Sequence, residues 1–135
     1  MKPFSIAAAL LMSAGAAIAA PEKYTLDASH SQIVFSYEHL GFSTTYGMFS
    51  GFEGEIMIDQ NDPTASRVKV SMPTKSMFTG WEARDGQFMS PDFFGATAED
   101  LITFTSTADE VTGDNTATVT GELTLHEVTT SAALE

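Results

Sequence analysis

Apolar and polar residues alternate in two runs near the middle of the chain, within residues 33–58. The apolar members are Ile33, Phe35 and Tyr37 in the first run and Phe52, Ile56 and Ile58 in the second. A period of two places one set of side chains on one face of a strand. The two runs therefore predict an antiparallel β-hairpin with one apolar face, connected through residues 41–45.

Three glycines interrupt the second run, at Gly47, Gly51 and Gly54. Glycine inside a strand indicates a bulge, a bend or a close approach of another backbone. Long, bent strands with one apolar face suit a curved sheet or a barrel, and a flat two-layer sandwich is the alternative.

Further alternation predicts strands over residues 67–72, 101–107 and 116–126. The first of these follows a turn rich in Asn, Asp and Pro and completes a meander with the central hairpin. The other two flank a hairpin turn at residues 112–115. The pattern thus predicts about five strands and an all-β fold.

The period changes between the third and fourth predicted strands, over residues 75–90. Phe78, Trp81, Asp85 and Phe88 follow one another at spacings of three and four, which indicates one face of a short helix. Gly80 and Gly86 weaken it, so we expect only one or two broken turns. The expected fold is an antiparallel β-barrel with this short helical insertion.

The first residues predict a signal peptide at residues 1–19, followed by a single domain at residues 20–135. Lys2 precedes an apolar run, and Ala17-Ile18-Ala19 fits a cleavage site. The run is short for a membrane span, and an uncleaved anchor is the alternative. This pattern predicts export to a periplasm or secretion.

The formal net charge of −12 limits the classes of partner. Binding to nucleic acid depends on Lys and Arg that neutralise phosphates, and only 6 such residues face 18 acidic ones. The acidity also disfavours anionic lipid surfaces, and its simplest explanation is solubility. The chain has no cysteine, which excludes disulfides and thiol chemistry.

Residues that could carry chemistry are few and scattered. The spacing of His30, His39 and His126 matches no metal-binding motif, and the chain has no G-x-S-x-G nucleophile elbow. His39 and His126 lie on predicted strands, where they either pack or contact a ligand near a barrel mouth. Arg84 either pairs with Asp85 and anchors the helical insertion, or reaches a ligand head group.

Several separated motifs resemble, in order and spacing, the YceI-like family of bacterial exported proteins. They are Tyr24-Thr25-Leu26-Asp27, Ser29-His30-Ser31, His39-Leu40-Gly41 with Ser43-Thr44, Gly47-x-Phe49, Phe52-x-Gly54, Asp62-Pro63, Arg84-Asp85, Ser90-x-Asp92-Phe93-Phe94, Ile102-Thr103-Phe104 and Gly121-x-Leu123-Thr124-Leu125-His126. The resemblance implies a lipocalin-like barrel whose apolar tunnel holds a polyisoprenoid, an isoprenoid quinone or a fatty amide. The family is not established as catalytic, so we expect a lipid carrier with no cofactor other than the bound lipid.

The chain departs from the family pattern in three places. Gln87 and Met89 stand where a histidine and a basic residue are common, and Glu127 stands where a glycine is usual. Members also carry further strands beyond the region of residues 123–129. Because a ligand-holding barrel needs about eight strands, we expect either completion by another chain, for example in a homodimer, or a fragment of a longer protein.

Together, the alternation and the resemblance predict which side chains contact the ligand. They are Ile33, Phe35, Tyr37, His39, Phe52, Ile56, Val70, Phe78, Trp81, Arg84, Phe88, Phe93, Phe94, Phe104, Val119 and Leu123. The aromatic residues of the insertion either cover the tunnel or only fill space beneath it. A hydrolase of lipids or amides on the same scaffold and a ligand-free structural domain are the two alternative functions.

Overall fold

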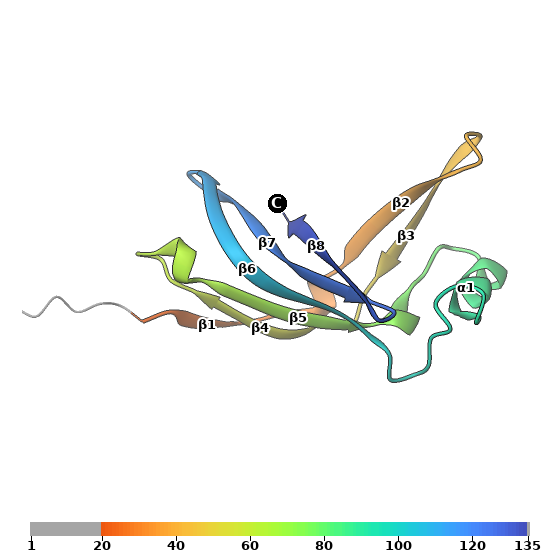
Figure 1. Ribbon diagram of the computed structural model, residues 1–135, viewed down its shortest axis with the longest axis horizontal. Coiled ribbons are helices and arrows are strands. Elements are labelled where there is room, and N and C mark those ends of the chain that lie inside the picture. Colours follow the sequence, from red (N-terminus) through yellow and green to blue (C-terminus); the bar gives the residue numbers. More distant parts are fainter. Residues whose placement is uncertain (1–19, 135) are drawn as a thin grey trace, which may run out of the picture.

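Two antiparallel sheets and one α-helix form the fold in the computed structural model, which describes residues 20–134 (Figure 1). The strands are β1 (Glu22–Thr25), β2 (Ile33–His39), β3 (Ser43–Phe49), β4 (Glu53–Ile58), β5 (Arg67–Pro73), β6 (Leu101–Gly113), β7 (Thr116–Leu125) and β8 (Val128–Leu134), and the helix α1 is Glu82–Met89. The prediction of an all-β, antiparallel, lipocalin-like fold is confirmed, with sheets that are not closed into a barrel. The predicted signal peptide lies outside the described residues.

Six strands form the larger sheet in the order β1-β4-β5-β6-β7-β8. The strands β2 and β3 form a separate hairpin that projects away from this sheet (Figure 1). The backbone of Met48 on β3 exchanges two hydrogen bonds of 2.9 Å with Phe78. The hairpin is therefore joined to the segment that leads into α1.

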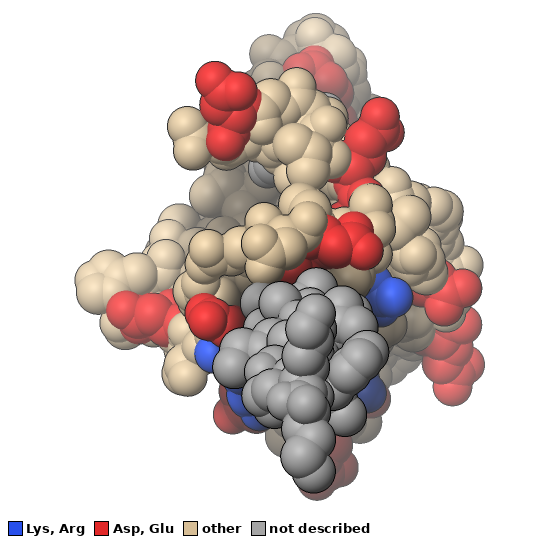
Figure 2. Space-filling model, turned by 90° about the vertical axis from the view of Figure 1, so that its left-hand side faces the viewer, with Lys and Arg blue, Asp and Glu red and all other residues tan. Residues whose placement is uncertain are grey.

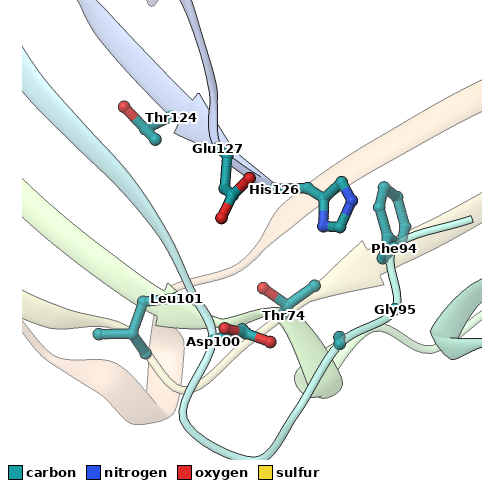
Figure 3. A pocket seen from close by; sticks show the side chains of 9 residues that line it. Thr74, Phe94, Gly95, Asp100, Leu101, Thr124, His126 and Glu127 are labelled. Carbon is teal, nitrogen blue, oxygen red and sulfur yellow. The ribbon is translucent and has the colours of Figure 1, made fainter. Parts of the chain in front are cut away.

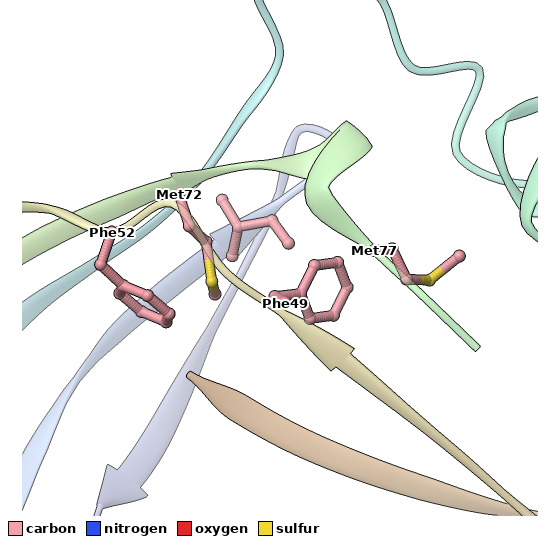
Figure 4. Close-up of a cluster of buried hydrophobic side chains, with 5 residues drawn as sticks. Phe49, Phe52, Met72 and Met77 are labelled. Carbon is pink, nitrogen blue, oxygen red and sulfur yellow. The ribbon is translucent and has the colours of Figure 1, made fainter. Parts of the chain in front are cut away.

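A small apolar core lies where the hairpin meets the larger sheet (Figure 4). Its buried members are Phe49, Phe52, Met72, Met77 and Ile102. The ring of Phe35 packs on that of Phe49 at a centroid distance of 5.3 Å and lies over Gly47, where a Cβ atom would come within 2.3 Å of it. Aromatic and methionine side chains thus hold the two sheets together at one end.

The prediction of one hairpin over residues 33–58 is wrong, because this region contains three strands. Gly51 adopts a φ of 72°, in the left-handed region that glycine favours, and the chain turns there between β3 and β4. The strand β4 consequently leaves the hairpin and pairs with β1 and β5. The hairpin turn is also shorter than predicted, since residues 43–45 pair with residues 37–39.

Within residues 20–134, β1 and β8 were not predicted and the second predicted run is divided between β3 and β4, so eight strands are present where about five were expected. The strand β1 has only four residues, all exposed, and β8 is composed mainly of Thr, Ser and Ala. Neither has the alternation of large apolar residues that makes a strand visible in a sequence. The helical insertion occurs at the predicted place in the chain, because the third and fourth predicted strands correspond to β5 and β6.

The predicted helix face is also wrong. Phe78 and Trp81 precede α1, which begins at Glu82, so only Asp85 and Phe88 of the four residues lie on the helix. Trp81 has an extended backbone and forms the N-terminal boundary. The spacing of three and four was coincidental, because Phe78 and Trp81 both precede α1 and Gly80 between them has a φ of 81°, which is not a helical conformation.

Candidate functional site

An apolar groove of about 490 Å³ follows one face of the six-stranded sheet. Six of the predicted ligand contacts line it, namely Ile33, Phe52, Ile56, Val70, Phe104 and Leu123. The lining also includes residues that the sequence analysis missed: Leu26, Val68, Met72, Ile102, Ala132 and Leu134, with His30, Ser31, Gln32 and Ser71 among the polar members. No Asp, Glu, Lys or Arg of the described chain lines this groove.

Strand register explains why these side chains converge. Val70 is paired with Phe104, and Phe104 is paired with Leu123, so three neighbouring strands present their large apolar residues at the same level. Gly121 makes space beside them, because a Cβ atom there would lie 2.4 Å from Cζ of Phe104. The groove therefore forms because every second residue of each strand faces the same side, and because the pairing of the strands aligns these residues with one another.

A second cavity of about 450 Å³ lies between the β2–β3 hairpin and α1. It gathers six other predicted contacts, namely Tyr37, His39, Trp81, Arg84, Phe88 and Phe93. The ring of Phe88 makes edge contacts with Tyr37 at 6.0 Å and with Phe93 at 5.3 Å. The predicted contacts thus form two separate sets and not one continuous lining.

Four predicted contacts lie elsewhere. Phe35 packs in the core against Phe49, and Phe78 is 57% exposed beside the hairpin. Val119 is half-buried on β7 opposite Leu134 and is not part of the groove lining. Phe94 contributes to a small polar pocket described below.

Arg84 is held by the segment that precedes the helix. Its Nε donates to the Thr79 hydroxyl and its Nη2 donates to the Thr79 carbonyl, each at 2.8 Å, and its guanidinium lies 5.7 Å from the centre of the Trp81 ring. Asp85 accepts hydrogen bonds from the backbone N–H of Thr79, at 3.0 Å, and from its hydroxyl. Both charged residues therefore anchor α1 through Thr79.

Replacing Thr79 with valine should loosen this anchor. The side chain of Thr79 is buried, and valine keeps its shape while removing the hydroxyl that both Arg84 and Asp85 bind. We expect a loss of about 1–3 kcal/mol in the free energy of unfolding. Urea titration followed by the fluorescence of Trp81, the single tryptophan, measures it. A loss below about 0.5 kcal/mol would contradict the anchoring role.

A polar pocket of about 270 Å³ lies beside the turn between β7 and β8 (Figure 3). Its polar side chains are those of Thr74, Asp100, Thr124, His126 and Glu127. Hydrogen bonds from the backbone amide and side chain of Thr97 are the main cause that lowers the pKa of Asp100 from its ordinary value, with nearby His126 and Lys75 adding to the effect. Asp100 is therefore a carboxylate at neutral pH.

His126 is not on a strand, as the sequence analysis predicted, but in this turn. His126 and Glu127 have φ values of 47° and 63°, which places both in the left-handed region. Such a pair is typical of the tight turns that join antiparallel strands, where Asn and Gly are the usual residues. Because neither residue is Asn or Gly, the sequence carried no signal for this turn.

Comparison with known proteins identifies the family. The model of the YceI-like domain matches residues 24–135. The chain belongs to the YceI-like family. It is 39% identical over 128 residues to Protein YceI of Shigella flexneri and 40% identical over 119 residues to a UPF0312 protein of Pseudomonas savastanoi pv. phaseolicola. These alignments cover 95% and 88% of this chain but 66% and 62% of the two relatives.

Solved structures agree with this family membership. BcnA of Burkholderia cenocepacia superposes with a TM-score of 0.66 at 22% identity, over 76% of this chain and 64% of BcnA. The YceI protein of Campylobacter jejuni gives a TM-score of 0.61 at 28% identity, over 82% of this chain and 64% of that protein. The YceI-like chain described here thus shares the fold of these proteins over about two thirds of their length.

Two features are absent from the part of this YceI-like chain that the structure describes. No helix within residues 20–134 is long and apolar enough to cross a membrane. No group of three or more His, Cys, Asp or Glu side chains in the same part of the chain is arranged to hold a metal ion. On the face seen in Figure 2, acidic side chains are spread over several parts of the surface and basic ones are few.

Proposed function

We propose that this YceI-like protein is an exported binding protein that holds a long apolar molecule along the groove of its six-stranded sheet. The ligand class is a polyisoprenoid, an isoprenoid quinone or a fatty amide. The observation that carries the proposal is the groove itself, whose volume is about 490 Å³ and whose lining is predominantly aliphatic and aromatic. A chain without polar groups is the ligand that such a lining favours.

Burial of hydrocarbon supplies the affinity in this mechanism. Each methylene group removed from water contributes roughly 0.8 kcal/mol, so a long chain binds tightly with few polar contacts. Among the described residues, His30 is the one ionisable member of the lining, and its Nδ1 lies 2.8 Å from Oδ2 of Asp27, which does not line the groove. The lining thus offers mainly hydrocarbon contacts, which supports binding as the function.

Displacement of a fluorescent apolar probe, N-phenyl-naphthylamine, by added lipid tests the proposal. We expect a polyisoprenol or a fatty amide to displace the probe, and extraction of the complex should return the lipid chemically unchanged. Recovery of a cleaved lipid would instead support the hydrolase alternative. Absence of both probe binding and lipid binding would contradict the proposal and leave the ligand-free structural domain.

A further inference from the structure

The apolar lining of the groove continues toward the second cavity, the one between the β2–β3 hairpin and α1. An apolar depression of about 410 Å³ shares Leu123 with the groove and Phe93 with the second cavity. Leu125 and Val128 also line this depression. They are paired with each other two residues along from the pair of Leu123 and Thr130, so all four lie on the groove face of the sheet. An apolar surface thus leads from the groove to the second cavity.

The β2–β3 hairpin also presents one face to both places. Ile33 lines the groove, while Tyr37 and His39 line the second cavity. These three residues are separated by even numbers of positions along β2, so their side chains lie on the same face of the strand. Four residues of strand span roughly 13 Å, which is the separation of Ile33 and Tyr37 along β2. A ligand whose hydrocarbon chain lies in the groove can therefore place its end in the second cavity.

The lining of the second cavity, unlike that of the groove, includes a permanently charged side chain. Arg84 lines this cavity from α1, and no Asp or Glu of the described residues does so. The other polar members of the lining are Tyr37, His39, Ser43, Thr45, Trp81 and Gln87. Arginine can only donate hydrogen bonds, so the charged group of this cavity matches a ligand atom that accepts them.

Arg84 has hydrogen-bond donors that the protein does not use. A guanidinium has five N–H donors, and Thr79 accepts from two donors of Arg84, which leaves three. Neither of the two ion pairs within residues 20–134 involves Arg84. The bonds to Thr79 and the contact with the Trp81 ring hold the half-buried guanidinium in place. A donor that is already held in place loses less entropy when a ligand binds.

We propose that the second cavity binds the carbonyl oxygen at the polar end of a long-chain ligand, with Arg84 as the donor. A carbonyl oxygen has two lone pairs and can accept two of the free N–H groups. The inference rests on the proposed function, because the hydrocarbon chain of this ligand must lie on the apolar lining.

The charges around Arg84 favour a neutral head group over a charged one. An ammonium group would bring more donors and a second positive charge to Arg84. A carboxylate would be repelled by the net charge of −12 and by Asp85, which shares the Thr79 hydroxyl with Arg84. An uncharged carbonyl accepts the same hydrogen bonds without either repulsion.

Three ligands with the same chain length test this head-group chemistry. Palmitamide ends in a neutral carbonyl, palmitate in a carboxylate and hexadecylamine in an ammonium group. Each ligand, below the concentration at which it aggregates, competes with N-phenyl-naphthylamine for the wild type and for each variant. The affinity of the probe itself is measured in every variant, because it reports on the apolar lining alone.

Arg84→Met removes the donors and keeps much of the length of the side chain. We expect it to weaken palmitamide about fivefold to tenfold relative to the probe, and Arg84→Lys to give an intermediate loss. Hexadecylamine should bind to Arg84→Met at least as tightly as to the wild type. Circular dichroism confirms that each variant is folded.

Two control variants separate the donors of Arg84 from its other effects. Thr79→Val loosens the anchor of α1 but keeps the guanidinium and the Thr79 carbonyl that accepts from it. Lys75→Met removes a positive charge from a residue that does not line the second cavity. Both controls should bind palmitamide within about twofold of the wild type, relative to the probe.

The outcomes distinguish this inference from the proposed function. Unchanged palmitamide affinity in Arg84→Met, or an equal loss in Thr79→Val, would overturn the head-group site alone. A loss of palmitate binding without a loss of palmitamide binding in Arg84→Met would also overturn it, since the site would then select an anion. If none of the three ligands displaces the probe from the wild type, the proposed binding function fails and the head-group site fails with it.

Discussion

Replacing Gly54 with alanine should unfold a large part of the six-stranded sheet. A Cβ atom at this position would lie 2.2 Å from the Lys69 carbonyl oxygen and 2.7 Å from the Cα atom of Val70, and both are backbone atoms of the neighbouring strand β5. The φ of 152° at Gly54 is also one that residues with side chains rarely adopt. We expect a loss of at least about 3 kcal/mol in the free energy of unfolding.

Gly86→Ala is the matched control for this change. Gly86 lies inside α1, and a Cβ atom there meets nothing within 4 Å. Alanine should therefore raise the free energy of unfolding by about 0.5–1 kcal/mol through helix propensity. Urea titrations of the wild type and both variants give the values, and a Gly54→Ala protein as stable as the wild type would contradict the close pairing of β4 with β5.

A carboxylate placed on the inner face of β8 should abolish ligand binding. Ala132 lines the groove and is half-buried on the edge strand, where a new side chain disturbs little of the core. In Ala132→Asp, a bound hydrocarbon chain would remove the charge from water without supplying a partner. We expect affinity for an uncharged long-chain ligand to fall at least about tenfold, measured by displacement of N-phenyl-naphthylamine.

The neighbouring residue gives a control on the same strand. Ala133 is exposed on the opposite face of β8, so Ala133→Asp adds the same charge outside the groove. This variant should bind the ligand as the wild type does, within about twofold. Equal loss of affinity in the two variants would mean that the charge acts through the stability of β8 and not through the groove.

The fold class was predictable because the sequences of the strands that line the groove alternate between apolar and polar residues. Val68 and Val70 on β5 show the period of two, and the fold places both in the lining. The division of residues 33–58 into three strands was not predictable, because it depends on the turn at Gly51 and on the pairing of β4 with β1. Alternation defines a face, but it does not define the partner of a strand.

Part of the groove lining was predictable for the same reason. The alternation of apolar and polar residues predicts that Phe104 and Leu123 face the groove. Nothing in the sequence around Ala132 shows that it faces the groove, because its direction depends on the pairing of β8 with β7. The polar pocket could not be predicted, since it combines Thr74, Asp100 and the His126-Glu127 turn from distant parts of the chain. Arg84 had two interpretations in the sequence; the hydrogen bonds to Thr79 show that it anchors α1, and its place in the lining of the second cavity keeps the predicted ligand contact open.

Native mass spectrometry of the protein, followed by organic extraction, tests the central claim most directly. The proposed function predicts a species heavier than the protein by one long-chain apolar molecule, which extraction releases unchanged. The Ala132→Asp variant should lack this species, and the Ala133→Asp variant should keep it. A ligand-free mass for the wild type, with no uptake of added polyisoprenol, fatty amide or hexadecanol, would contradict the claim that the groove is a binding site.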